Sequence, residues 1–123
     1  MAPRILASED PNIVTAKPGK NVTLKCHAPN SNIIIVEWTR VDLGKKWVLL
    51  YRDGRLEDDD QHPSFVNRVD LQDIQMKDGD VSLILKNVTT ADAGIYKCRV
   101  AQKSGQPMSL ITTINLTVVP PAL

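Results

Sequence analysis

The fold of this chain is decided by the stretch Asp92-Ala93-Gly94-Ile95-Tyr96-Lys97-Cys98. Its tyrosine lies two residues before a cysteine, and the other cysteine, Cys26, lies 72 positions earlier. Trp38 follows Cys26 by twelve residues. This order of cysteine, tryptophan and Tyr-x-Cys predicts a sandwich of two β-sheets with a tryptophan in its core.

The chain is short and nearly neutral. Its 123 residues suffice for one domain, and its formal net charge is +1, with acidic and basic residues interspersed. This charge pattern shows no basic patch of the kind that binds nucleic acid or an anionic membrane, so the expected partner is a protein. No apolar stretch approaches the roughly 20 residues that cross a bilayer, and Met1-Ala2-Pro3-Arg4 lacks the apolar core of a signal peptide. We interpret Met1 as the expression start of an excised fragment.

Strand signals recur at short intervals with turn residues between them. The segment 47–51 holds more large apolar residues than one half-buried face can hide, so some of them are expected to be exposed. About 40 residues separate Trp38 from Val81, which favours nine strands over seven. In the last strand, Leu110, Thr112, Ile114, Leu116 and Val118 are expected to face inward. Strands are expected at residues 21–27, 36–39, 47–51, 67–71, 81–85, 96–100 and 110–118.

From residue 11 to residue 119 the chain resembles the V-set immunoglobulin family, whose D-x-G-x-Y-x-C run matches Asp92 to Cys98. Three stretches are similar to the butyrophilin, myelin-oligodendrocyte-glycoprotein and costimulatory-ligand group: Leu50-Tyr51-Arg52-Asp53-Gly54-Arg55, Asp58-Asp59-Asp60-Gln61 and Asn67-Arg68-Val69-Asp70-Leu71. Adhesion receptors of the adenovirus-receptor and junctional type share much of this framework. Residues 109–118 lack the Gly-x-Gly bulge of antigen-receptor V domains, which argues against an antibody or T-cell-receptor chain.

The resemblance implies an all-β, V-type immunoglobulin sandwich of two antiparallel Greek-key sheets with about nine strands. It also implies one disulfide between the sheets, from Cys26 to Cys98, with Trp38 packed on it and the Tyr96 hydroxyl bonded back to the chain at a corner. A zinc site with His27 and His62 is the competing interpretation of the cysteines. Neither cysteine has another cysteine two to four residues away, so the disulfide is preferred.

The sequence contains two notable charged features: one is interpreted as part of the structural scaffold and the other as a solvated loop. Arg68 and Asp92 resemble the V-set ion pair at the base of the sandwich, which specifies the fold more than it stabilises it. The run Asp58-Asp59-Asp60 lacks the alternating oxygen ligands and glycine turn of a calcium loop, so a solvated loop is expected there.

The domain boundaries are expected at three points. Residues 1–10 are interpreted as an N-terminal extension or expression remnant, residues 11–119 as the V-set domain, and residues 120–123 as the start of a linker to a following domain or stalk. Pro120-Pro121 cannot donate to a sheet and favours an extended segment.

Three N-x-S/T sequons begin at Asn21, Asn87 and Asn115. Together with an even cysteine count, they indicate an oxidising, secretory compartment and three candidate glycosylation sites. Asn115 faces away from the inward row of its strand, so a glycan there would lie on or beside the sheet expected to bind a partner.

No catalytic set is found, because no serine or cysteine lies in a nucleophile context and both cysteines are committed to the fold. We therefore expect no enzyme, no cofactor, no nucleic acid and no direct membrane contact by this domain. The resemblance implies a membrane-distal, extracellular module of a type I cell-surface protein, which acts as ligand or receptor by binding another immunoglobulin-like domain through the sheet of strands G, F, C and C′. Homophilic cell–cell adhesion, with a homodimer, and immune recognition of non-self ligands are the alternatives. The expected contact residues are Trp47, Leu49 and Tyr51 as anchors, and Glu37, Thr39, Arg99, Gln102 and Lys103 as polar neighbours.

Overall fold

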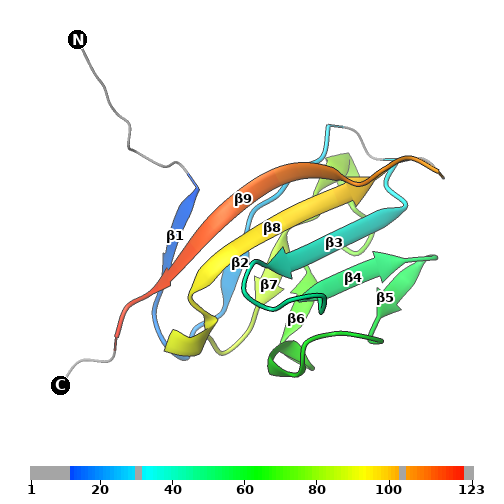
Figure 1. Cartoon of the computed structure of the whole chain (residues 1–123). Coiled ribbons are helices and arrows are strands. Elements are labelled where there is room, and N and C mark those ends of the chain that lie inside the picture. The colour runs from blue at the N-terminus through cyan, green and yellow to red at the C-terminus, as the bar shows by residue number, and fades with distance from the viewer. Residues whose placement is uncertain (1–11, 30–31, 103–104, 121–123) are drawn as a thin grey trace, which may run out of the picture.

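The computed structural model describes residues 12–29, 32–102 and 105–120 (Figure 1). The extension expected at residues 1–10 and the final three residues of the expected linker lie outside these ranges.

Nine strands form two sheets within the described residues. The front sheet has the order β1-β9-β8-β3-β4-β5, and the back sheet has the order β2-β7-β6 (Figure 1). The strands are β1 Ile13–Ala16, β2 Val22–Leu24, β3 Ile35–Arg40, β4 Leu49–Arg52, β5 Arg55–Glu57, β6 Val69–Leu71, β7 Leu83–Leu85, β8 Gly94–Ala101 and β9 Ser109–Val118. In the part of the chain that the structure describes, three short 3-10 helices lie between them: η2 Pro63–Phe65, η3 Lys77–Gly79 and η4 Thr90–Asp92.

The expected all-β sandwich is confirmed. Neighbouring strands are antiparallel, except that β1 pairs parallel with β9, from Ile13 opposite Asn115 to Ala16 opposite Val118. The strand expected at residues 21–27 is shorter, because β2 ends at Leu24 and the chain then makes only an isolated bridge from His27 to Asp80.

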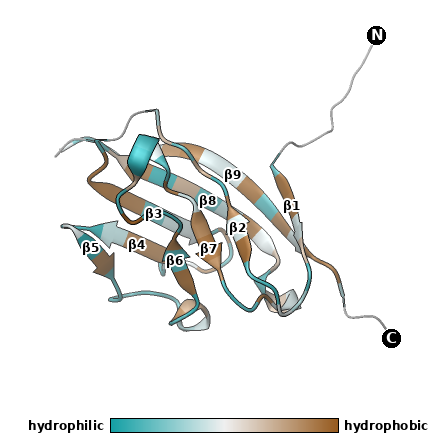
Figure 2. Cartoon of the chain, turned by 180° about the vertical axis from the view of Figure 1, so that it is seen from behind, coloured by the Kyte–Doolittle hydropathy of each residue, from teal (hydrophilic) through white to brown (hydrophobic). Residues whose placement is uncertain are grey.

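The core lies between the two sheets, where alternate residues of each strand point inward. Hydrophobic and more polar residues alternate along β9 in the view from behind (Figure 2). The disulfide is confirmed: Cys26, just after β2 of the back sheet, is bonded to Cys98 on β8 of the front sheet. Trp38 is fully buried beside this bridge, and its indole Nε1 donates a 2.9 Å hydrogen bond to the Val81 carbonyl. The staple and the tryptophan therefore tie the two sheets together.

A two-residue turn joins β4 to β5. Asp53 and Gly54 have φ values of 56° and 80°, and Arg52 and Arg55 face each other across the strands. Positive φ at both central residues matches the twist of a two-residue hairpin, and Asp-Gly is a preferred sequence for it. This turn extends the front sheet to its outermost strand.

Candidate functional site

The outer face of the front sheet carries a continuous row of side chains across five strands. Strand pairing places Leu110 of β9 opposite Arg99 of β8, Arg99 opposite Glu37 of β3, Glu37 opposite Leu50 of β4, and Leu50 opposite Glu57 of β5. Directly opposed residues share a face of the sheet. We use the term front face for two neighbouring rows on β9, β8 and β3. The first row is Leu110, Arg99 and Glu37, and the second row, nearer the base of the sandwich, is Thr113, Lys97 and Thr39.

The centre of the front face is polar and held in place by side-chain contacts. Arg99 Nη1 donates a 3.1 Å hydrogen bond to Thr39 Oγ1 and lies 3.8 Å from Glu37 Oε1. The Arg99 and Glu37 side chains remain 31% and 26% exposed. The structure thus brings together three of the polar residues expected to contact a partner, and their orientation is fixed before any partner arrives.

Leu110 is the apolar residue of the front face, and its orientation corrects the sequence-based expectation. The register of β8 and β9 shifts between Cys98 and Arg99: Cys98 faces Thr112, whereas Arg99 faces Leu110. Ile111 is the extra residue of this bulge and packs against the core, so Leu110 turns outward and is 52% exposed. The alternation from Thr112 onward had predicted Leu110 to be inside. The adjacent apolar pair Leu110-Ile111 was the only signal in the sequence that alternation breaks here.

Of the expected contact anchors, Leu49 and Tyr51 face the core; the expectation is wrong for Leu49, which is buried, and the contact role of Tyr51 stays a prediction. Leu49 pairs with Trp38 and Tyr51 pairs with Val36, and both partners belong to the buried core. Leu49 is 3% exposed, and Tyr51 is half-buried against the core. Leu49 therefore offers no contact surface.

Leu50 takes the outward position on β4 instead, yet it too is hidden. It is 3% exposed, with Glu37 and Glu57 as its cross-strand neighbours. The Glu57 carboxylate is held by Arg52 and Arg55, each at 3.2 Å. Among the central strands, the front sheet therefore exposes a large apolar side chain at β9, Leu110, and not at β4; Ile13 on β1 and Leu56 on β5, 50% and 37% exposed, lie on its two edge strands.

Trp47 lies just before β4 and is half-buried outside the main core. Its backbone is fixed by hydrogen bonds to the Asp60 carbonyl, at 3.2 Å, and from the His62 amide, at 2.9 Å. Its Nε1 is buried and has no hydrogen-bond partner among the described residues. Its role as a contact anchor stays a prediction. Gln102 is half-buried next to the same sheet, and Lys103 lies outside the described residues.

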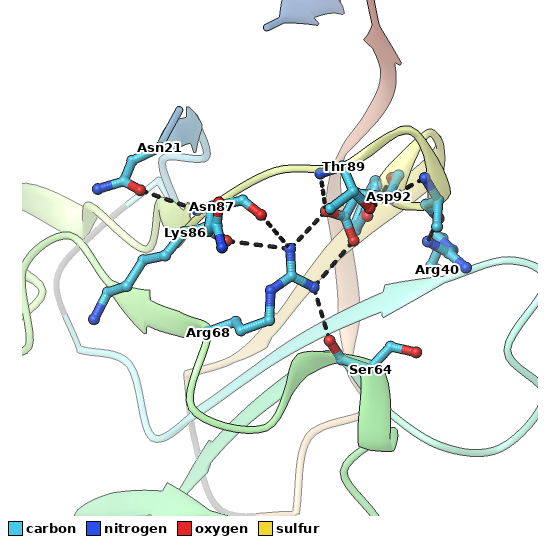
Figure 3. A network of polar contacts seen from close by, with 10 residues as sticks. Asn21, Arg40, Ser64, Arg68, Lys86, Asn87, Thr89 and Asp92 are labelled. Atoms are coloured by element: carbon cyan, nitrogen blue, oxygen red, sulfur yellow. Dashed lines mark hydrogen bonds and ion pairs between the residues drawn. The ribbon is translucent and has the colours of Figure 1, made fainter. Parts of the chain in front are cut away.

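The base of the sandwich is organised around Arg68 (Figure 3). Its Nη2 lies 2.6 Å from Asp92 Oδ2, and its Nη1 lies 3.2 Å from Asp92 Oδ1. The same guanidinium donates to the carbonyls of Ser64, Lys86 and Asn87 at 2.8 to 3.1 Å. Asp92 Oδ2 also accepts from the Thr89 amide at 2.8 Å. The network joins two segments distant in sequence, 64–68 and 86–92, away from the front face.

Sequence reasoning missed Arg40, which completes the base. Its guanidinium carbon lies 5.6 Å from the Phe65 ring centre and 5.9 Å from that of Tyr96. Its Nη1 donates to the Ala91 carbonyl at 3.0 Å. A Cβ on Gly94 would come within 2.8 Å of Arg40 Cδ, which gives the glycine of the Asp-Ala-Gly-Ile-Tyr run a packing reason.

The Tyr96 hydroxyl is buried and donates a 2.6 Å hydrogen bond to the Asp92 carbonyl. Burial raises its pKa to about 12 from an ordinary value of 10.0. The folded state holds this proton more tightly than the unfolded state does. The resulting stability is complete below about pH 10 and is lost as the pH rises through about 12.

We therefore expect the free energy of unfolding to fall by on the order of 2–3 kcal/mol between about pH 10 and pH 12. Tyr51→Phe leaves Tyr96 as the only tyrosine, so tyrosinate absorbance of this variant reports the Tyr96 hydroxyl alone. Tyr96→Phe should remove most of the tyrosine-dependent loss. Titration of Tyr96 at its ordinary pKa, with the chain still folded, would contradict the expectation.

The three sequons lie in two places. Asn21 and Asn87 are both exposed at the base, and Asn21 Oδ1 accepts a 3.1 Å hydrogen bond from the Asn87 amide (Figure 3). Asn115 lies on β9 opposite Ile95, on the outer side of the front sheet, and is half-buried. Glycosylation at all three remains a prediction.

Within the described ranges, no three metal-ligating side chains gather into a metal site. None of the helices in these ranges is long and apolar enough to span a bilayer.

Comparison with known proteins identifies the family. The sequence profile described as Immunoglobulin V-set domain matches residues 9–119. Human butyrophilin subfamily 2 member A2 is 32% identical over 90 residues, which cover 71% of this chain and 17% of that protein. Human junctional adhesion molecule B is 30% identical over 118 residues, covering 93% of this chain and 35% of that protein. The solved structure of ICOS in complex with ICOS-L and an anti ICOS-L VNAR domain contains a similar chain, with 26% identity and a TM-score of 0.70, covering 87% of this chain and 53% of that one.

The chain thus spans only 17% and 35% of the length of these two curated relatives. The resemblance to butyrophilin and junctional-adhesion proteins that was inferred from the sequence is confirmed. With a profile match over residues 9–119 and a sandwich closed by the Cys26–Cys98 disulfide, the chain belongs to the V-set immunoglobulin family, a family of recognition domains and not of enzymes.

Proposed function

We propose that this chain is the extracellular recognition module of a type I cell-surface protein and that its front face binds another immunoglobulin-like domain, as ligand or receptor. The observation that carries the proposal is the row in which the exposed Leu110 lies beside the Arg99–Glu37 pair. Interfaces combine an apolar centre with ordered polar neighbours, and arginine is enriched among residues that contribute strongly to binding.

Charge on the front face supports a protein partner. The front face holds Arg99, Lys97 and Glu37, so its net charge is +1, and the residues directly opposite Lys97 are the threonines Thr39 and Thr113. A partner surface that is mildly acidic opposite Lys97 and apolar opposite Leu110 would complement it. One similar solved chain comes from a complex of ICOS with ICOS-L, and one relative is an adhesion molecule; both support a protein-binding role.

A glycan at Asn115 is compatible with this face. Asn115 lies opposite Ile95, with the row of Lys97 and Thr113 between it and the row of Arg99 and Leu110. Leu110 and Asn115 are five positions apart on β9, which corresponds to about 15 Å, or about half the length of this strand. A glycan would cover the half of the sheet nearest the base and leave the Leu110 half open. This spacing supports a front face that could be glycosylated at Asn115 and still bind through Leu110.

The experiment tests Leu110→Asp for binding to a panel of purified immunoglobulin-like ectodomains, measured by biolayer interferometry with the chain in tetrameric form. We expect binding to at least one ectodomain and a loss of 2 kcal/mol or more for the variant, about thirtyfold in affinity. Leu110 is half-exposed, so the melting temperature should change little.

Val66→Asp is the matched control, because Val66 is 47% exposed and lies at the end of η2, away from the front face. Lys25→Glu tests charge reversal beside the back sheet. Both controls should bind as the unmodified chain does. Binding that survives Leu110→Asp but fails in Lys25→Glu would place the interface on the other sheet and refute the proposal.

Homophilic adhesion is the second candidate, favoured by the similarity to junctional adhesion molecule B over 93% of this chain. It uses the same face, with a second copy as the partner. Sedimentation equilibrium over a range of concentrations separates the two. Self-association abolished by Leu110→Asp supports adhesion, and a monomer at all concentrations supports a heterotypic partner.

A further inference from the structure

A row of apolar side chains crosses the outer side of the front sheet in the half nearest the base, where β1, β9, β8 and β3 lie side by side (Figure 1). Ile13 of β1 lies opposite Asn115 of β9, and Asn115 lies opposite Ile95 of β8. Val41, just after β3, continues the row, because its amide donates a 3.0 Å hydrogen bond to the Ile95 carbonyl. Ile13 and Val41 are 50% and 56% exposed, and Ile95 is half-buried. We call Ile13, Ile95 and Val41 the base strip.

The base strip lies between polar residues. On one side of it is the row of Thr113, Lys97 and Thr39, and on the other side Thr15 of β1 pairs with Thr117 of β9. Threonine is a β-branched residue that suits a strand as isoleucine and valine do. Strand formation therefore does not require apolar residues on this side of the sheet. Exposed apolar residues scattered singly need no explanation, whereas a row of them indicates a surface that something covers.

Asn115 lies within this row and is the acceptor of the sequon Asn115-Leu116-Thr117. Its backbone amide is bonded to the Asn12 carbonyl at 3.0 Å, and β9 is paired on both sides, so its side chain projects from a fixed point. Neighbouring strands are about 4.8 Å apart, so Ile13 and Ile95 each lie one strand spacing from Asn115. A glycan on Asn115 therefore begins between two apolar side chains.

We propose that the glycan on Asn115 lies back on the base strip and covers it with its first sugar rings. N-acetylglucosamine carries C–H groups on its ring faces and an acetyl methyl group, and its hydroxyls project from the rim of the ring. Contact of the C–H groups with Ile13 and Ile95 removes apolar surface from water and leaves the hydroxyls hydrated. The inference goes beyond the proposed function, which requires only that a glycan at this position be tolerated.

A sugar linked to Asn115 fits the strip better than a separate protein chain does. A protein chain would bury the Asn115 carboxamide in the middle of an apolar contact, and burial of a polar group costs free energy unless it gains a hydrogen bond. A separate chain also loses translational and rotational freedom when it binds, whereas a linked sugar is already held beside the strip. The strip therefore points to the chain's own glycan as its cover.

The test uses the full chain secreted from mammalian cells, with its glycans intact. Peptide mass spectrometry should find a glycan on Asn115. Asn115→Gln removes this glycan and should lower the melting temperature by about 4 °C, the shift expected when roughly 40 Å² of apolar surface returns to water in a domain of this size. Thr117→Ser is the matched control, because it keeps the sequon and a hydroxyl beside Thr15. It should carry the glycan and melt close to the unmodified chain.

A double-mutant cycle tests whether the glycan acts through the base strip. In a chain with Ile13→Thr and Ile95→Thr, loss of the glycan should lower the melting temperature by less than half as much, because less apolar surface is left to cover. In Ile74→Thr the loss should keep its full effect. Ile74 is 52% exposed, like Ile13, but it lies between β6 and η3, outside the strip.

The inference is overturned by an Asn115 without a glycan, by an unchanged melting temperature in Asn115→Gln, or by an equal effect of the glycan in the chain with Ile13→Thr and Ile95→Thr. Sedimentation equilibrium tests the other occupant. Self-association of the glycosylated chain that these two substitutions abolish would assign the strip to a second copy and overturn the inference too. None of these outcomes bears on Leu110→Asp, so failure of the base strip and failure of the front face are distinguishable.

Discussion

Replacing Arg68 by alanine is expected to lower the free energy of unfolding by about 3–5 kcal/mol. The Asp92 side chain is 3% exposed and depends on Arg68 for two of its contacts. Without the guanidinium, a buried carboxylate loses its opposite charge, and the carbonyls of Ser64, Lys86 and Asn87 lose a donor. Urea unfolding followed by tryptophan fluorescence measures the change.

Arg52→Ala provides the matched control for this prediction. Arg52 also pairs with a carboxylate, that of Glu57, at 3.2 Å, but its side chain is 45% exposed and Arg55 remains to hold the same group. Its loss should cost less than about 1 kcal/mol. If the two variants were equally stable, the base network would have no special role in the fold. Front-face binding by folded Arg68→Ala should be unchanged, because the network lies at the base.

Removing the disulfide is expected to cost a similar amount, about 4 kcal/mol in the chain-entropy description. The bond between Cys26 and Cys98 closes a loop with a sequence separation of 72 residues, so the oxidised unfolded chain has far fewer conformations than the reduced one. Compactness of the reduced unfolded chain makes the loss smaller. Unfolding of the oxidised and reduced chain in urea gives the difference directly.

The double variant Cys26→Ala with Cys98→Ala separates the cross-link from the packing of the sulfur atoms. It should be at least as unstable as the reduced chain, because both sites are buried and the substitution leaves space beside Trp38. Intact-mass measurement after alkylation without reductant should find no free thiol. Two alkylated cysteines in the native chain would contradict the pairing.

The sequence predicted the scaffold well because its residues combine in a pattern with few alternatives. Cys26, Trp38, Tyr96 and Cys98 are each large or reactive, and each has a fixed place in the sandwich. The Arg68–Asp92 contact was implied by resemblance alone, since nothing in the sequence states that positions so far apart meet.

The orientation of β4 could not be predicted from the sequence. The segment 47–51 is apolar throughout, so its alternation does not say which residues point inward. The pairing of Leu49 with Trp38 decides the question, and it depends on the register between two strands. Val48 adds a further irregularity, because its amide bonds the Trp38 carbonyl and it is buried in the core beside Leu49.

The outward turn of Leu110 escaped prediction for a related reason. A bulge adds one residue to a strand, and the alternation then changes phase at that residue. Here the change of phase converts an expected core leucine into the main exposed apolar residue of the front face. The scaffold was therefore predictable from residue identity, whereas the make-up of the proposed binding surface depended on the pairing of neighbouring backbones.

The parallel pairing of β1 with β9 gives the domain resistance to tension along the chain. β1 and β9 run in the same direction, so a pull toward the N-terminus on Ile13 and a pull toward the C-terminus on Val118 slide the strands past each other. The bonds from Asn115 to Asn12 and from Val119 to Ala16, and the contact of Thr15 with Thr117, are then loaded together and must break together. An antiparallel pair pulled from one end would open one bond at a time. A pull on the two ends of the domain therefore loads the first and last strands in shear, and the bonds between them resist it together.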